Sequence, residues 1–290
     1  MASKKFLSTF KLVAKVAFTT LLVYLVFQKI DFGKVTATIG RSEPLWLVAA
    51  LILYACSQVV SSWRLHGLLN TLAIPVGFFF NLRLYQLGMF YNVFLPGGIG
   101  GDGYKIYLLR KKFGTTARLL LLTLLFDRAS GLLAITLLAA TATLFLPVLA
   151  LPVYLPLIYI VVALAVFYGC WRWFFHGAVT YFPSAVMKAL LVQSVQCVAM
   201  YCILRALNVT GSYLPYIFSF LLSTIATVIP VSVGGLGLRE YVMVQLAPLL
   251  LLDEATAVSA SFCFYLISTL AALPGLWFVY RDQSLSSRTK

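Results

Sequence analysis

Charged residues are scarce in this sequence, and no long polar segment interrupts it. Aspartate, glutamate, lysine and arginine make up 10% of the 290 residues, and the longest polar stretches are the loop from Lys29 to Glu43 and the tail after Arg281. Neither stretch is long enough for a soluble catalytic domain, whose surface would need many more charges. Hydrophobic residues instead reach 62%, with a mean hydropathy of +0.97. This balance excludes an ordinary soluble protein and indicates a membrane protein.

The sequence also lacks the motifs of metal, disulfide and nucleotide chemistry. Its five cysteines stand in apolar segments without C-x-x-C spacing, and His66 and His176 have no partner at metal-ligand spacing. No G-x-x-x-x-G-K-[ST] motif for ATP occurs. We therefore expect no metal, no cofactor, no catalytic residues and a protein that is not an enzyme. Basic residues outnumber acidic ones by 22 to 8, but in a membrane such an excess sets orientation, so no nucleic-acid partner is expected.

About 20 apolar residues cross a bilayer as a helix, and the sequence contains six candidate runs. They are residues 12–28, 45–62, 119–146, 153–171, 186–206 and 256–280. Two further regions, 78–110 and 213–252, are apolar but broken near their middle by proline and glycine, which cannot continue a regular helix. The pattern predicts an all-α polytopic membrane protein with six full spans and two re-entrant broken-helix hairpins. No convincing signal-peptide cleavage site follows the first run, so it is expected to be a retained helix.

The two broken regions carry the same motif. Residues 96–105 read PGGIGGDGYK and residues 230–239 read PVSVGGLGLR, so both fit P-x-x-[IV]-G-G-x-G-x-[KR]. Interrupted helices at matching points of two halves indicate the binding site of a transporter. We therefore expect a single transmembrane domain, 1–290, made of a first half, 1–150, and a second half, 151–290.

The basic residues favour hairpins over full crossings at the two broken regions. With a cytoplasmic N-terminus and two hairpins, most lysines and arginines face the cytoplasm, as the positive-inside tendency requires. If residues 78–95 crossed fully, the cluster of Arg110, Lys111 and Lys112 would face outward. Because three full crossings separate the hairpins, they dip from opposite sides and the two halves are inverted. Both termini are expected on the cytoplasmic side of the cell membrane.

Ionisable side chains within or beside the apolar regions are the first candidates for a binding site. They are Arg83, Asp102, Lys105, Asp127, Arg128, Arg239 and Glu240. An unpaired charge at a helix centre costs about 2.5–3.5 kcal/mol, so these groups need a wet polar cavity or an internal salt-bridge network. Neighbours on a helix diverge by about 100°, so Asp127 cannot pair with Arg128 and is expected to pair with Arg83 or Lys105. The set has one excess positive charge, which would complement an anionic headgroup.

Three segments together resemble a known family. Residues 95–102 (LPGGIGGD), 127–131 (DRASG) and 229–240 (IPVSVGGLGLRE) are similar to the flippase-like transmembrane region of the lysylphosphatidylglycerol synthase/flippase (multiple peptide resistance factor) family, and the similarity covers nearly the whole chain. The synthase domain of the bifunctional members is absent, so the resemblance implies lipid translocation without synthesis. It implies a site at Pro96, Gly100, Gly101, Asp102, Asp127, Arg128, Pro230, Ser232, Gly234, Gly235, Arg239 and Glu240. Arg83 and Lys105 are added by the charge argument alone.

The preferred hypothesis is a lipid flippase with membrane lipids as its partners. It would move an anionic or polyprenyl-phosphate-linked headgroup along a polar groove at the two Gly-rich loops, because exposed backbone amides and helix N-termini favour anions. A homodimer and a separate lipid-modifying enzyme are the protein partners considered. The alternatives are a membrane-embedded lipid or sugar transferase, its auxiliary subunit, and a small-solute secondary transporter. The alternative interpretation of the glycines in the two loops is structural: they would only allow helices to cross closely.

Overall fold

The computed structural model describes residues 32–94, 100–228 and 235–280, and all regular elements within these ranges are helices. The first half contains α2 (Phe32–Gly40), α3 (Pro44–Thr71), α4 (Phe78–Phe94), α5 (Gly100–Phe113), α6 (Ala117–Thr143) and the short 3₁₀ helix η1 (Pro147–Leu149). The second half contains α7 (Tyr154–Phe174), the 3₁₀ helix η2 (His176–Tyr181), α8 (Phe182–Ala206), α9 (Leu214–Ala226), α10 (Leu238–Leu246), α11 (Glu254–Ala272) and α12 (Pro274–Tyr280).

Five stretches of the described chain are long and apolar enough to cross a membrane. They are Pro44–Thr71, Ala117–Thr143, Tyr154–Phe174, His176–Ala206 and Glu254–Phe278. They coincide with five of the six spans predicted from the sequence, while the predicted span 12–28 lies outside the described residues. The expectation of an all-helical, multi-pass membrane protein is therefore confirmed.

Helix α3 extends beyond the predicted second span. The apolar run stops at residue 62, but α3 continues to Thr71 and carries Arg64 in its buried part. Arg64 can be buried there because it has an internal partner, described below. Sequence hydropathy cannot detect such a partner because it lies on another helix.

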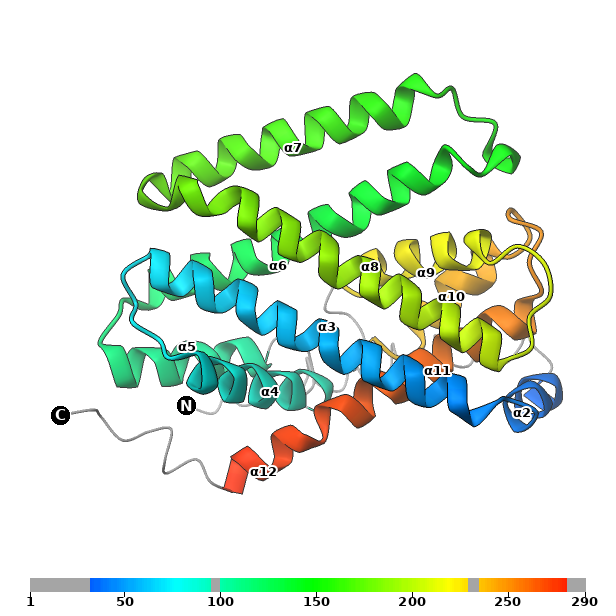
Figure 1. Ribbon diagram of the computed structural model, residues 1–290, viewed down its shortest axis with the longest axis horizontal. Helices are drawn as coiled ribbons and strands as arrows, with labels where there is room; N and C mark the ends of the chain where they lie inside the picture. Colours follow the sequence, from blue (N-terminus) through cyan, green and yellow to red (C-terminus); the bar gives the residue numbers. More distant parts are fainter. Residues whose placement is uncertain (1–31, 95–99, 229–234, 281–290) are drawn as a thin grey trace, which may run out of the picture.

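Helices α3 and α8 form the central contact between the two halves and run antiparallel (Figure 1). The Glu43 amide at the start of α3 donates to Ala206 O at the end of α8, with N and O 2.9 Å apart. Further along, Gln196 Nε2 lies 3.2 Å from Ser57 Oγ, on α3. Small side chains such as Ala50 and Ala199 are fully buried and let the two backbones approach closely.

Each broken region forms a pair of short helices that pack on each other, α4 with α5 and α9 with α10. Figure 1 shows α4 and α5 toward the end of the molecule where α3 ends and α6 begins, whereas α9 and α10 lie toward the opposite end. Close approach in the first pair needs glycine, because a Cβ on Gly101 would lie 2.0 Å from Gly88 O. In the second pair, Gly237 begins α10 with φ = 81°, which favours glycine.

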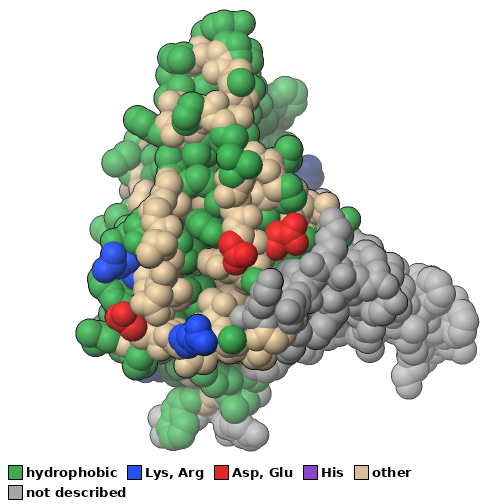
Figure 2. Space-filling view, turned by 90° about the vertical axis from the view of Figure 1, so that its right-hand side faces the viewer, with side chains coloured by type: hydrophobic (Ala, Val, Ile, Leu, Met, Phe, Trp, Pro, Cys, Tyr) green, Lys and Arg blue, Asp and Glu red, His purple; other side chains and the backbone are tan. Residues whose placement is uncertain are grey.

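The two ends of the helix assembly differ in charge. One end carries only basic side chains among the described residues: Arg110, Lys111, Lys112, Arg118, Arg172 and Lys188. The other end carries Glu43, Asp253 and Glu254 together with Arg41 and Arg205, and Figure 2 looks at this end. Helix α7 lies at one edge and exposes apolar residues such as Val161 and Val166, as expected for a surface in contact with lipid.

Candidate functional site

Asp102 lies in the first turn of α5 and holds two basic side chains. Its carboxylate accepts a hydrogen bond from Arg128 Nε of α6, and its other oxygen lies 3.3 Å from Lys105 Nζ. The amide of Gly101 donates to Asn92 Oδ1 at 2.9 Å, which ties the start of α5 to α4. A carboxylate at a helix N-terminus is stabilised by the helix dipole, so Asp102 is placed where its charge is favourable.

Lys105 is buried, and a glycine makes room for it. A Cβ on Gly88 would lie 2.2 Å from Lys105 Cε, so any larger residue at position 88 would displace the lysine. Lys105 Nζ lies 4.3 Å from the centroid of the Tyr85 ring on α4. The lysine is thus held by a carboxylate on its own helix and by an aromatic face on the neighbouring helix.

Asp127 forms a buried ion pair with Arg64. Arg64 Nε donates to Asp127 Oδ1 at 2.8 Å and Arg64 Nη2 donates to Asp127 Oδ2 at 3.2 Å, which is the bidentate geometry favoured by guanidinium and carboxylate. Arg64 and Asp127 are 5% and 6% exposed. The predicted partners of Asp127 were therefore wrong: Arg83 is exposed on α4, and Lys105 pairs with Asp102.

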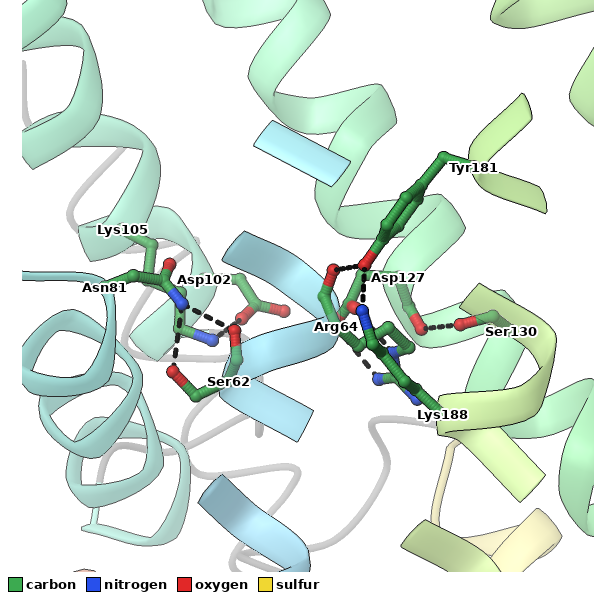
Figure 3. A network of polar contacts seen from close by, with 9 residues as sticks. All are labelled: Ser62, Arg64, Asn81, Asp102, Lys105, Asp127, Ser130, Tyr181 and Lys188. Atoms are coloured by element: carbon green, nitrogen blue, oxygen red, sulfur yellow. Dashed lines mark hydrogen bonds and ion pairs between the residues drawn. The ribbon is translucent and has the colours of Figure 1, made fainter. Parts of the chain in front are cut away.

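Polar contacts continue from this ion pair toward the basic end. Tyr181 Oη donates to Arg64 O at 2.9 Å, and Lys188 Nζ donates to Tyr181 Oη at 3.1 Å. Figure 3 shows this group on one side of α3 and the group of Asp102 and Lys105 on the other. Helix α3 thus lies between the group on α5 and a second group, in which its own Arg64 meets residues of α6, η2 and α8.

We call Arg64, Asp102, Lys105, Asp127 and Arg128 the buried charge cluster. It contains three basic and two acidic side chains and so has one excess positive charge. The Arg128 side chain is 39% exposed, whereas that of its partner Asp102 is 11% exposed. Arg128 is therefore the cation of the cluster that an external anion can reach most easily.

The second half places its charges differently. Glu240 accepts hydrogen bonds from the Gly237 amide at 2.7 Å and from Ser261 Oγ at 2.8 Å, so it caps α10 and links it to α11. The Arg239 guanidinium carbon lies 5.0 Å from the Phe264 ring centroid and 5.7 Å from that of Phe220. Arg239 Nε is buried and has no hydrogen-bond partner within the described ranges.

The other predicted site residues fall into three groups. Gly100 and Gly101 form the start of α5, next to Asp102, and Gly235 precedes α10 with φ = 83°. Ser232 and Gly234 lie outside the described residues, as do Pro96 and Pro230. Arg83 is exposed on α4, and within the described residues it forms no ion pair with the buried charge cluster. The described ranges contain no group of three or more His, Cys, Asp or Glu side chains that could hold a metal ion.

Sequence reasoning missed Arg64, Tyr181 and Lys188. The predicted topology counted Arg64 and Lys188 only among the basic residues of the cytoplasmic side, and it gave Tyr181 no role. A usable signal was present for Arg64: it follows the apolar run directly and precedes further apolar residues, Leu65, Leu68 and Leu69, which are all buried. A lone arginine inside a longer helix requires a buried carboxylate, and Asp127 was the unpaired candidate.

The long apolar helices and the internal charges define the class as a multi-pass helical membrane protein. Within this class, the chain belongs to the family described as the lysylphosphatidylglycerol synthase TM region, whose model matches residues 12–182 and 178–275. This match confirms the family resemblance seen in the sequence and supports a lipid-related function in the membrane. No curated protein matches the chain.

Proposed function

We propose that this protein is a lipid flippase that moves an anionic or polyprenyl-phosphate-linked headgroup across the bilayer while the lipid chains remain in the membrane. The observation that carries the proposal is Arg128, an accessible cation held by Asp102 at the N-terminus of α5. A partly exposed guanidinium beside a helix N-terminus favours a phosphate group. The excess positive charge of the buried charge cluster acts in the same direction.

The arrangement of the helices supports two inverted halves with a re-entrant hairpin in each. The corresponding helices α3 and α8 run antiparallel, and the two helix pairs lie toward opposite ends of the molecule (Figure 1). The contacts are also reciprocal: α6 of the first half packs on α9 of the second, and α11 of the second packs on α4 of the first. Inverted halves offer one half-site to each leaflet, which is what alternating access requires.

The two half-sites share a basic residue. Lys105 and Arg239 occupy the same position of the repeated motif, and each lies over an aromatic ring of the preceding helix, Tyr85 or Phe220. We infer that a headgroup passes from Arg128 and Lys105 to Arg239. The intermediate loop segments, 95–99 and 229–234, lie outside the described residues.

The charge of the two ends supports an orientation in the cell membrane. Since cytoplasmic loops are rich in lysine and arginine, the end with Arg110, Lys111 and Lys112 faces the cytoplasm. The end with Glu43 and Asp253 then faces outward. Both termini lie on the cytoplasmic side in this proposal, as an even number of full crossings requires.

A leaflet assay with purified protein in liposomes tests the proposal. Native protein is expected to move headgroup-labelled phosphatidylglycerol between leaflets without ATP and to leave it chemically unchanged. Because a hydrogen bond to a charged group contributes about 1.5–3 kcal/mol, Arg128→Gln is expected to slow movement about tenfold or more. Arg172→Gln, an exposed arginine at the end of α7, is the matched control and should behave like native protein.

The chemistry of the recovered lipid separates the classes of function. Mass spectrometry that finds an altered headgroup would contradict the flippase proposal and favour a transferase. Equal rates for native protein and Arg128→Gln would remove Arg128 from the site. An intact lipid that never changes leaflet, across anionic, zwitterionic and polyprenyl-linked headgroups, would leave the role of an auxiliary subunit.

A further inference from the structure

A small pocket lies between α3, α4 and α11, outside the buried charge cluster. Its volume is about 160 Å³, and it is lined by Ala55, Gln58 and Val59 of α3, by Leu82, Tyr85 and Gln86 of α4, and by Ala271 of α11. The lining residues of α3 lie at the middle of this helix, which is a candidate membrane span. The pocket is therefore far from both ends of the span and at the depth of the lipid chains.

The outer rim of the pocket faces lipid. Val59 is 45% exposed, and Ile52 and Val48 on the same helix are 58% and 52% exposed. Apolar side chains exposed along a membrane-spanning helix contact acyl chains. A lipid chain lying against this face of α3 would thus pass directly over the pocket.

The pocket is lined by two glutamine side chains, although it lies at the depth of the lipid chains. Gln86 Oε1 is buried and has no hydrogen-bond partner among the described residues, and Gln86 Nε2 makes only a long contact of 3.4 Å with Ala271 O. Gln58 Nε2 lies 3.2 Å from Ser57 Oγ. A buried polar group without a partner costs about 1–3 kcal/mol. The unpartnered Gln86 oxygen, at the depth of the lipid chains, therefore favours a polar group of a bound ligand at this place.

The inner wall of the pocket connects it to the buried charge cluster. Tyr85 lines the pocket, and its ring lies 4.3 Å from Lys105 Nζ. Lys105 in turn pairs with Asp102, which holds Arg128. One aromatic side chain thus separates a lipid-facing pocket from the basic residues that would bind a headgroup.

The corresponding junction in the second half has a different lining. There α6, α8 and α9 meet in a cluster of apolar residues that includes Ile135, Ala139, Cys197, Phe218 and Leu221. The pocket of the first half is instead lined by two glutamines as well as by apolar residues.

We propose that this pocket is the lateral opening through which a membrane lipid reaches the buried charge cluster. The headgroup lies beside Lys105 and Arg128, the polar linkage below the headgroup contacts Gln58 and Gln86, and the chain lies along the exposed face of α3. A cavity of about 150 Å³ holds a molecule the size of benzene, so the pocket takes the linkage and not a whole lipid. The inference deepens the flippase proposal, since it supplies the path by which the chains stay in the bilayer.

Two neighbouring residues of α3 give a matched test. Ala55 and Cys56 are both small and exposed, but only Ala55 lines the pocket. Native protein, Ala55→Phe and Cys56→Phe are reconstituted with phosphatidylglycerol. Native mass spectrometry then counts retained lipid, and the leaflet assay measures its movement. We expect Ala55→Phe to lose the retained lipid and to move lipid about tenfold more slowly, whereas Cys56→Phe stays within about twofold of native protein.

The two readouts separate failure of this inference from failure of the proposed function. If native protein moves lipid and Ala55→Phe moves and retains it equally well, the lateral opening is elsewhere and the flippase proposal stands. In a second outcome, native protein retains lipid without moving it. If Ala55→Phe then loses the retained lipid and Cys56→Phe keeps it, the lipid site stands and the flippase proposal fails. Native protein that retains no lipid overturns the site.

A second variant, which removes a polar group from the pocket, covers the case in which Ala55→Phe does not fold. Gln86→Met keeps the approximate size of the side chain but removes the amide oxygen and nitrogen, and gel filtration with thermal unfolding checks that the protein is intact. We expect less retained lipid and slower movement in folded Gln86→Met protein, because the linkage loses its polar contact. Unchanged retention in this variant would contradict the role given to Gln86.

Discussion

The two broken-helix regions begin from the same motif but stabilise their basic residue in different ways. Lys105 in the first lies over Tyr85 and pairs with Asp102, whereas Arg239 in the second lies over Phe220 and Phe264. Leu236 occupies the motif position that corresponds to Asp102. The comparison shows that both regions place a cation beside an aromatic ring of the preceding helix, while only the first has a carboxylate at the motif position of Asp102.

The helices α6 and α11, which form the third predicted span of each half, differ in the same way. In the first half, α6 contributes Asp127 to an ion pair with Arg64 of α3. In the second half, α11 contributes Ser261, which donates to Glu240 of α10. The first half therefore contains a network of full charges, and the second contains a capped helix and an arginine held by aromatic rings. A headgroup that moves from the first half to the second would leave a network of ion pairs and reach an arginine held by aromatic rings.

The largest expected effect comes from breaking the ion pair that the second half lacks. Asp127→Ala leaves Arg64 buried and unpaired, which costs about 3–5 kcal/mol and should lower the yield of folded protein and its thermal unfolding temperature in detergent. Replacing both residues, Arg64→Met with Asp127→Leu, should restore most of the stability, because no uncompensated charge remains. If Asp127→Ala protein were as stable as native protein, the ion pair would have to be solvated by water in the native state.

The next largest effect comes from giving the second region the carboxylate of the first. In Leu236→Asp the new carboxylate would lie near Arg239 and compete with an anionic headgroup. A charge-assisted contact of about 1.5–3 kcal/mol should slow lipid movement about tenfold. Leu236→Asn, which has nearly the same shape but no charge, is the control in the same leaflet assay. Equal rates for the two variants would mean that Arg239 does not contact the headgroup.

A smaller effect is expected from the aromatic ring beside Arg239. Phe220→Leu removes one ring face from the guanidinium and keeps an apolar side chain in its place. Cation–π contacts contribute about 0.5–2 kcal/mol, so lipid movement should change by a few-fold, with folded protein retained. The matching variant of the first region, Tyr85→Leu, should have a weaker electrostatic effect because Asp102 still holds Lys105. The ratio of the lipid-movement rates of the two variants measures how far the two halves differ in their dependence on the aromatic ring.

The smallest effect is expected from Arg83→Gln. The sequence placed Arg83 among the candidate site residues, but this side chain is exposed on α4, and Asp127 is satisfied by Arg64. The contribution of an exposed charge to stability is typically about 0–1 kcal/mol. Lipid movement by this variant should stay close to that of native protein. A loss as large as that of Arg128→Gln would restore Arg83 to the site.

Most of the fold was accessible from the sequence because hydropathy is a local property. Five predicted spans coincide with long apolar helices, and both broken regions form two short helices at the expected places. The family was also accessible, since its motifs are continuous strings such as residues 95–102. The partner of Asp127 was not, because Arg64 lies on another helix and looked like the end of a span.

The sequence by itself determined which segments prefer the bilayer, where proline and glycine break them, and where the repeated motif puts a basic residue. Each of these follows from residues close together along the chain. Only the tertiary structure decided which charges meet. Packing of α5 and α6 brings Arg128 to Asp102, and packing of α3 on α6 brings Arg64 to Asp127. Such pairing depends on distances between helices, and these are fixed by small buried residues, by Gly88 and Gly101, and by the shape of the whole assembly.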